Sequence, residues 1–193
     1  MSLHPIIARA AEGTLPDWVC AGDARRAHME RVASLLSEWA EAWALEVEDR
    51  ARWCAAGYLH DAVRDADPEE LRPRMPPAMR AFPGHLLHGP VAAERLRVEG
   101  VEDGELLNAV AYHTVGDAGF GELGHALYAA DFLEPGRTFR PEWRAELRTR
   151  VPDDLDGVVR DIARARIGHL IERGLPVLPR TIAFWNRLAG DAS

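Results

Sequence analysis

The chain has 193 residues, of which 47% are hydrophobic and 28% charged, and its formal net charge is −8. This length and composition are typical of one folded domain with a sizeable core, and they exclude an intrinsically disordered chain. The acidic balance argues against non-specific binding of nucleic acid, which favours basic surfaces. We therefore expect a single domain over residues 1–193, with its core at about 24–188, and no nucleic-acid partner.

The cysteine content and the terminal sequence indicate the compartment. Cys20 and Cys54 are too few for a disulfide framework, and we expect both to be free thiols in a reducing cytoplasm. The first ten residues lack the basic start and long apolar run of a signal peptide. No stretch of 18 apolar residues offers a membrane span. The sequence therefore predicts a cytoplasmic protein that does not bind membranes.

Apolar residues recur with helical spacing along almost the whole chain, and no alternating run is long enough to indicate a strand. The expected fold class is therefore all-α, a helical bundle. Asp23 is well placed to cap the first long helix. The expected helices cover residues 23–45, 48–62, a segment beginning just after 88, and residues 103–114, 122–133, 141–150, 155–172 and 179–188.

The segment 64–85 interrupts this helical pattern with five prolines, which predict a loop with at most a short helix near 69–72. A loop so rich in proline either lies over a functional site or simply connects two helices on the surface, and the sequence does not favour one of these. Pro90 is suited to the first turn of the next helix, which would place His88 at the entrance of that helix.

Six potential metal ligands are distributed over the expected helices. Residues three, four and seven apart share one helix face, and His28 shares its face with Val32 and Leu35. By this rule four of the six side chains point inward among apolar neighbours: those of His28, His60, His113 and Asp131. A buried polar group without a partner costs about 1 to 3 kcal/mol, and a buried carboxylate far more. A cation bound by all the clustered side chains would offset this cost. The six residues are His28, His60, Asp61, His88, His113 and Asp131.

Taken alone, each of these histidines is more often a hydrogen-bonded core or surface residue than a ligand. Their joint inward placement favours a metal site. Neighbouring residues on a helix differ by about 100° in direction, so His60 and Asp61 cannot aim at one point unless the helix ends there or Asp61 bridges two ions. We expect the remaining histidines to be structural or exposed, with His85 considered separately below; they are His4, His125 and His169.

Several segments around these residues resemble one known family. They are the His60-Asp61 pair, His88-Gly89-Pro90-Val91, Tyr112-His113-Thr114 with Gly116, Ala130 to Pro135 with Arg137, and the tail Leu175 to Pro179. Their order is similar to that of the HD-domain superfamily of metal-dependent phosphohydrolases, and more narrowly to its bacterial YqeK branch, whose members are symmetrical diadenosine tetraphosphate hydrolases. The resemblance covers roughly residues 24–188, nearly the whole chain.

The resemblance implies a centre of two divalent metal ions, typically iron, held by the six residues named above, with Asp61 as the bridging carboxylate. An imidazole-rich ligand set suits iron, manganese, cobalt or zinc better than magnesium. His85 competes with His88 for the third histidine position, and we favour His88 because the Gly-Pro-Val that follows matches the motif. The implied reaction is hydrolysis of diadenosine tetraphosphate to two ADP by a metal-activated hydroxide.

The expected catalytic residues are Asp61 and Arg64, and the expected substrate-binding residues are Arg137, Arg64, His85 and Thr114. Arg137 is the first choice for a phosphate clamp, because its planar guanidinium matches two phosphate oxygens; an ordinary surface ion pair is the alternative. Arg64 stands where the family commonly has a lysine, and arginine keeps its proton, so only electrostatic stabilisation would remain.

Two further residues differ from the family pattern at positions expected to affect substrate binding. Asp117 follows His113 where the family tends to have an arginine, and it would repel a polyphosphate; His125 replaces a lysine. Two alternatives therefore stand beside the main interpretation: a nucleotide phosphohydrolase of different specificity, and a metal-bound nucleotide-binding regulatory module without turnover. The expected partner is a dinucleoside polyphosphate or nucleotide substrate, and a homodimer is compatible with the sequence.

Overall fold

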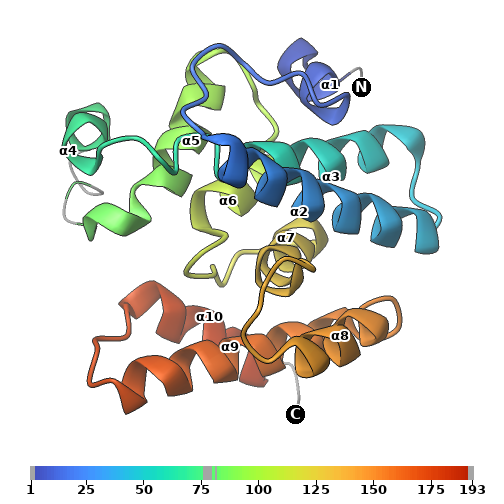
Figure 1. Cartoon of the computed structure of the whole chain (residues 1–193), viewed down its shortest axis with the longest axis vertical. Helices are drawn as coiled ribbons and strands as arrows, with labels where there is room; N and C mark the ends of the chain where they lie inside the picture. Colours follow the sequence, from blue (N-terminus) through green and yellow to red (C-terminus); the bar gives the residue numbers. More distant parts are fainter. Residues whose placement is uncertain (1–2, 76–79, 81, 191–193) are drawn as a thin grey trace.

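The computed structural model describes residues 3–75, 80 and 82–190. Within this part of the chain the protein is built from helices and has no strand, as expected (Figure 1). The helices are α1 (Pro5–Ala11), α2 (Asp23–Ala42), α3 (Val47–Leu59), α4 (Pro68–Leu71), α5 (His88–Val98), α6 (Gly104–Tyr112), α7 (Glu122–Leu133), α8 (Pro141–Arg150), α9 (Leu155–Glu172) and α10 (Pro179–Gly190), with short 3₁₀ turns at Arg72–Arg74 and Gly84–Leu86.

Several helix ends and one whole helix differ from the expectation, and α10 extends to Gly190, two residues beyond its expected end. Helix α2 ends at Ala42, not at 45, because Ala44 takes the left-handed conformation (φ 52°). Helix α3 ends at Leu59, not at 62, where the chain turns and Arg64 N donates to Asp61 O. Helix α6 ends at Tyr112. Helix α1 was not predicted; Pro5 stands in its first turn. The short helix α4 is confirmed, whereas residues 76–79 and 81 of the predicted loop lie outside the described residues.

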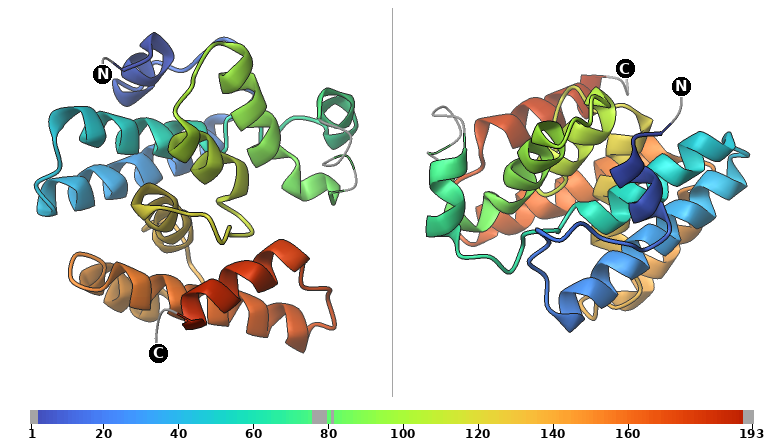
Figure 2. Two further views of the ribbon diagram at one scale, coloured as in Figure 1. Left: turned by 180° about the vertical axis from the view of Figure 1, so that it is seen from behind. Right: turned by 90° about the horizontal axis from the view of Figure 1, so that it is seen from above.

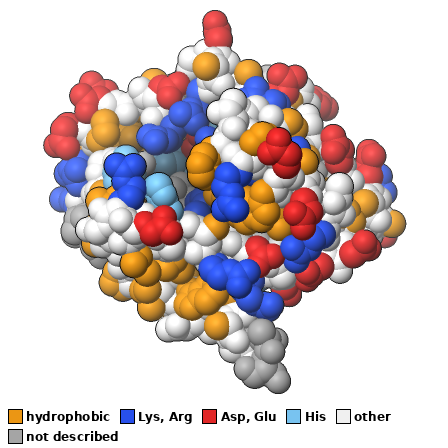
Figure 3. All heavy atoms as spheres, turned by 60° about the horizontal axis from the view of Figure 1, so that its bottom comes forward, with side chains coloured by type: hydrophobic (Ala, Val, Ile, Leu, Met, Phe, Trp, Pro, Cys, Tyr) orange, Lys and Arg blue, Asp and Glu red, His pale blue; other side chains and the backbone are white. Residues whose placement is uncertain are grey.

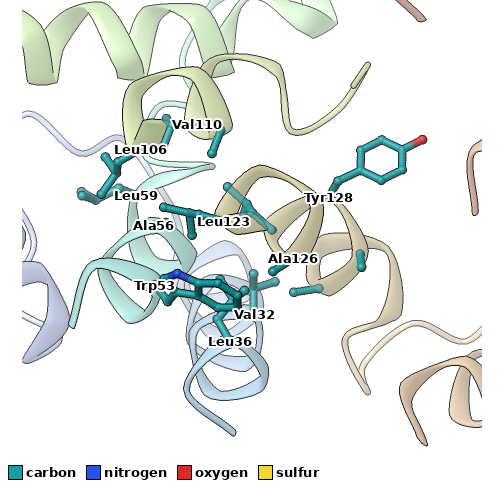
Figure 4. Packing of buried hydrophobic residues seen from close by; sticks show 14 of the residues in the cluster. Val32, Leu36, Trp53, Ala56, Leu59, Leu106, Val110, Leu123, Ala126 and Tyr128 are labelled. Atoms are coloured by element: carbon teal, nitrogen blue, oxygen red, sulfur yellow. The ribbon is translucent and has the colours of Figure 1, made fainter. Parts of the chain in front are cut away.

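The helices form layers around α7, which lies near the centre of the molecule. Helices α2 and α3 run side by side above it, with α1 packed on α3, and α5 packs on α6; α8, α9 and α10 lie below (Figures 1 and 2). Figure 4 shows the core between α2, α3, α6 and α7, where side chains such as Leu36, Trp53 and Leu123 meet. No described helix has the length and apolar character needed to cross a membrane.

Two glycines let the helices approach closely beside the predicted ligands. A Cβ atom at Gly57 would lie 2.4 Å from the Cα atom of Ala33 on α2, and a Cβ atom at Gly89 would lie 2.7 Å from the carbonyl oxygen of Ala111 on α6. Both distances are too short for any side chain. Glycine is therefore required for the packing of α3 on α2 and of α5 on α6.

Candidate metal centre

The structure brings all six side chains named as potential ligands to one place, and each is at most 7% exposed. Four of them stand at helix ends, where the direction of a side chain is not tied to the helical repeat. Helix α2 carries His28, the turn after α3 carries His60 and Asp61, α5 begins with His88, α6 is followed by His113, and α7 carries Asp131.

Three of the four imidazoles are oriented by the same local device. In each, Nδ1 is hydrogen-bonded to the carbonyl oxygen three residues earlier, a group left free by the end of a helix or turn. Because a carbonyl only accepts, Nδ1 carries the proton and Nε2 keeps its lone pair in the neutral ring. The pairs are His60 with Gly57 (2.7 Å), His88 with His85 (3.0 Å) and His113 with Val110 (2.9 Å).

The fourth imidazole, His28, is oriented by a carboxylate. Its Nδ1 lies 3.2 Å from Oε1 of Glu134, and Arg31 Nε donates to Oε2 of the same carboxylate at 2.5 Å. Glu134 is only 2% exposed, yet sequence analysis gave it no role. Its position three residues after Asp131, within the Ala130 to Pro135 motif, is the signal by which it could have been found. Carboxylates commonly orient metal-binding histidines in this way.

The four Nε2 atoms converge. The Nε2 atoms of His28 and His60 are 3.2 Å apart, as are those of His88 and His113. Since each Nδ1 already donates to an acceptor, neutral rings would bring lone pairs together, an arrangement that a cation between them resolves. Figure 3 shows histidine side chains within a hollow of the surface, with arginine side chains around it.

Asp61 lies between the two pairs of rings. Its Oδ2 is 3.7 Å from Nε2 of both His28 and His60, while its Oδ1 is 3.2 Å from His88 and 3.4 Å from His113. One carboxylate therefore presents a separate oxygen to each pair. Two groups of donor atoms are close enough to hold an ion: His28, His60 and Asp131 form one, and His60, Asp61 and His113 form the other.

The protonation states of His60, His88 and the two carboxylates suit cation binding. The pKa of His28, by contrast, is raised, because the lowering effect of burial is outweighed by its hydrogen bonds with Asp131 and Glu134. Burial lowers the pKa of His60 to about 4 and also lowers that of His88. Burial alone would raise the pKa of Asp61, but the neighbouring imidazoles hold it well below its usual range, and His28 and Arg166 do the same for Asp131. At neutral pH the centre thus offers unprotonated His60 and His88 and ionised carboxylates, the forms that bind metal.

Three arginines pair with the two carboxylates. Arg137 Nη2 lies 2.7 Å from Oδ1 of Asp131, and Arg166 Nη2 lies 3.2 Å from Oδ2. Arg25 Nη1 lies 2.6 Å from Oδ2 of Asp61. Arg137 was expected near the site, whereas Arg25 and Arg166 were not. Basic residues on helices usually face solvent, so the sequence alone did not single them out.

The other predicted substrate residues border the centre at different depths. Thr114 Oγ1 lies 3.0 Å from Nε2 of His113, and Arg64 is half-buried, with its positive charge helping to lower the pKa of His88. The side chain of His85 is exposed, and its carbonyl oxygen orients the ring of His88. His125 lies elsewhere, with Nδ1 2.9 Å from Asp156.

Asp117 is not a bare negative charge. Its Oδ2 forms an ion pair with Arg180 of α10, whose guanidinium stacks 3.9 Å from the ring centroid of Tyr112. Asp117 also accepts the backbone N–H of Gly119 at 2.8 Å. The repulsion expected from the sequence is therefore largely neutralised within the protein.

An all-helical shell around buried histidine and aspartate side chains that could hold a metal ion is the architecture of an HD-type hydrolase. The model of the HD domain family matches residues 25–165, and the protein belongs to this family. Membership implies that the centre binds divalent metal.

More particular similarities lie within the family. The chain is 30% identical over 139 residues to a protein of Halalkalibacterium halodurans and 31% identical over 145 residues to one of Bacillus subtilis, both named "Bis(5'-nucleosyl)-tetraphosphatase, symmetrical". These matches cover 69% and 71% of this chain and 73% and 76% of the relatives. A solved structure from Clostridium acetobutylicum, a predicted HD superfamily hydrolase involved in NAD metabolism, superposes with a TM-score of 0.77 at 25% identity over 99% of both chains. The resemblance stated from the sequence is thereby confirmed.

Proposed function

We propose that this protein hydrolyses diadenosine tetraphosphate symmetrically to two ADP at a centre of two divalent metal ions. The observation that carries the proposal is the position of Asp61, whose two carboxylate oxygens face different pairs of imidazole nitrogens. The names of the relatives support the choice of substrate. When bound, two cations would supply an activated water at neutral pH and neutralise charge on the phosphoryl oxygens.

The proposed ligands are the six clustered side chains. His28, His60 and Asp131 would form one side of the centre, His88 and His113 the other, with Asp61 shared. The family resemblance favours iron; four nitrogen donors suit iron, manganese, cobalt or zinc equally, and a metal analysis would distinguish them. The Nδ1 hydrogen bonds keep each ring in a fixed orientation, so the nitrogen donors need no rearrangement to bind.

The proposed substrate contacts are arginines and a hydroxyl at the edge of the centre. Arg137 has a side chain that is 39% exposed, so part of its guanidinium is available to a phosphate. Arg64 would stabilise charge without donating its proton, since a guanidinium group stays protonated in proteins. Thr114 Oγ1 is close enough to the ligands to meet a phosphoryl oxygen, and the exposed His85 would contact a more distant part of the substrate.

We also propose a cytoplasmic location, since Cys20 and Cys54 are both free thiols. A net charge of −8 supports a small nucleotide, not a nucleic acid, as partner. The association of two copies into a homodimer stays a prediction, which light scattering of the purified protein would test.

The test begins with elemental analysis of the untreated protein. Diadenosine tetraphosphate is then supplied with iron or manganese, and the products are separated by ion-exchange chromatography. Two ADP per substrate are expected. ATP with AMP, or turnover only of other nucleotides, would reject the symmetrical assignment in favour of a different phosphohydrolase. Tight nucleotide binding without any hydrolysis would indicate the regulatory module.

A further inference from the structure

Arg25 has a place at the metal centre that the proposed ligand set does not explain. It lies in the first turn of α2, three residues before His28, and its side chain is 26% exposed. Nη1 reaches Oδ2 of Asp61 at 2.6 Å, while the buried Nε has no hydrogen-bond acceptor among the residues that the structure describes and lies 3.5 Å from Oδ1 of Asp65. A guanidinium has five N–H donors, so Arg25 keeps donors for another anion.

Arg25 and Arg137 occupy the two ends of one chain of contacts. Arg25 meets Asp61, whose Oδ2 is 3.7 Å from Nε2 of His28; that nitrogen is 3.3 Å from Oδ1 of Asp131, which meets Arg137. Both arginines are partly exposed. A single phosphate over the cluster needs one such contact, whereas a chain of phosphates can use both.

Metal binding would change what these arginines neutralise. In the structure each guanidinium balances a carboxylate that is a proposed ligand. Once Asp61 and Asp131 bind divalent cations, their charge is balanced by the metal, and the flexible guanidinium groups become available to phosphoryl oxygens. When Arg25 moves away from Asp61, its Nε also leaves the buried position in which this donor lacks an acceptor among the described residues.

We propose that Arg25 is a phosphate-binding residue that acts with Arg137; this inference rests on the proposed function. The two hold phosphoryl groups on opposite sides of the scissile anhydride and so fix the register of the substrate. A water oxygen bonds to one central phosphorus, and the bond from that phosphorus to the central bridging oxygen breaks. Its electron pair leaves with the departing ADP, and above the phosphate pKa of about 6 both water protons pass to solvent.

The experiment compares Arg25→Gln and Arg25→Lys with Arg26→Gln, a substitution at an exposed neighbour whose Nε donates to Ala21 O. Metal content, binding of ADP by calorimetry and the products formed from diadenosine tetraphosphate are measured on each metal-loaded protein. We expect Arg25→Gln to keep its metal, to bind ADP about tenfold more weakly and to release some AMP with ATP. Arg25→Lys should recover part of the ADP affinity, and Arg26→Gln should match the wild type.

Two results would overturn the assignment. Unchanged ADP binding with ADP as the sole product would show that Arg25 does not touch the substrate. Loss of metal in proportion to activity would show that Arg25 only balances the charge of Asp61. Failure of the proposed function is separate: a wild type that leaves diadenosine tetraphosphate intact rejects that function, while the ADP titration still reports whether Arg25 binds phosphate.

Discussion

Glu134 and His28 share a buried contact in which Oε1 lies 3.2 Å from Nδ1, on the side of the ring away from the clustered nitrogens. Glu134 is itself held by Arg31 and by the backbone N–H of Gly136 at 2.6 Å. The carboxylate therefore fixes both the orientation and the tautomer of the ring, and it increases the basicity of Nε2.

Replacement Glu134→Gln keeps the shape of this contact but removes the charge. We expect the affinity for metal to fall about 10- to 100-fold with the helical fold retained. Competition with a chromophoric chelator measures the affinity, and circular dichroism measures the helix content. Glu38→Gln, at an exposed position on the same helix as His28, is the control and should bind metal like the wild type. Equal affinities in all three proteins would remove Glu134 from the centre.

Asp61→Ala should abolish metal binding and hydrolysis together. The substitution removes the one carboxylate that lies between both pairs of imidazoles. The core packs mainly through apolar helix faces, so the circular dichroism spectrum should stay helical. Elemental analysis after gel filtration gives the metal content. His125→Gln, a substitution outside the cluster, is the control and should keep both metal and activity. A variant that retained full metal and turnover would show that Asp61 is not a bridging ligand.

The ion pair between Asp117 and Arg180 predicts a charge-swap experiment. Arg180→Asp alone should weaken nucleotide binding, because it places two carboxylates together on the segment that follows His113, and it should lower stability by about 1 kcal/mol. The double variant Asp117→Arg with Arg180→Asp restores opposite charges and should recover most of the stability. Urea unfolding of the wild type, the single variants Arg180→Asp and Asp117→Arg, and the double variant measures the coupling. Additive losses in the double variant would show that the pair contributes nothing.

The lowered pKa of His60 predicts acid sensitivity of the metal-free protein. The pKa is about 4 in the folded state and near 6.5 when the ring is free, so between these values the unfolded chain binds a proton that the folded chain does not. Stability therefore falls as the pH falls through this window, by roughly 3 kcal/mol for this group.

Urea unfolding of the chelated protein between pH 7 and 4 measures this effect. His60→Gln removes the titrating group while His28 and the other histidines stay, so its stability should change less with pH than that of the wild type. Parallel pH profiles for the two proteins would contradict the assignment of the effect to His60.

Much of the centre could be predicted from the sequence because its members lie on apolar helix faces. His28 has buried Val32 and Leu35 one and two turns away, and that spacing alone indicates an inward side chain. The adjacency of His60 and Asp61 suggested either a helix end or a bridging carboxylate. The structure has the helix end, since α3 stops at Leu59, and a carboxylate placed between two pairs of rings.

The charged residues around the ligands could not be predicted in the same way. Arg25 and Arg31 lie on α2 in a sequence rich in charge, where an inward guanidinium cannot be told from a solvated one. Their partners come from distant segments, as Glu134 does for Arg31 and Asp61 for Arg25. The end of α2 was also predicted three residues too late, because the turn at Ala44 depends on a left-handed backbone that alanine rarely adopts.

Gly57 offers no donor atom beyond its backbone, yet its lack of a side chain sets how near the rings of His28 and His60 can come. A methyl group there would act as a wedge against Ala33, 2.4 Å from its Cα atom, and would push apart the two helices that carry those rings. The spacing of the two rings thus depends partly on steric fit at a residue that belongs to neither of them.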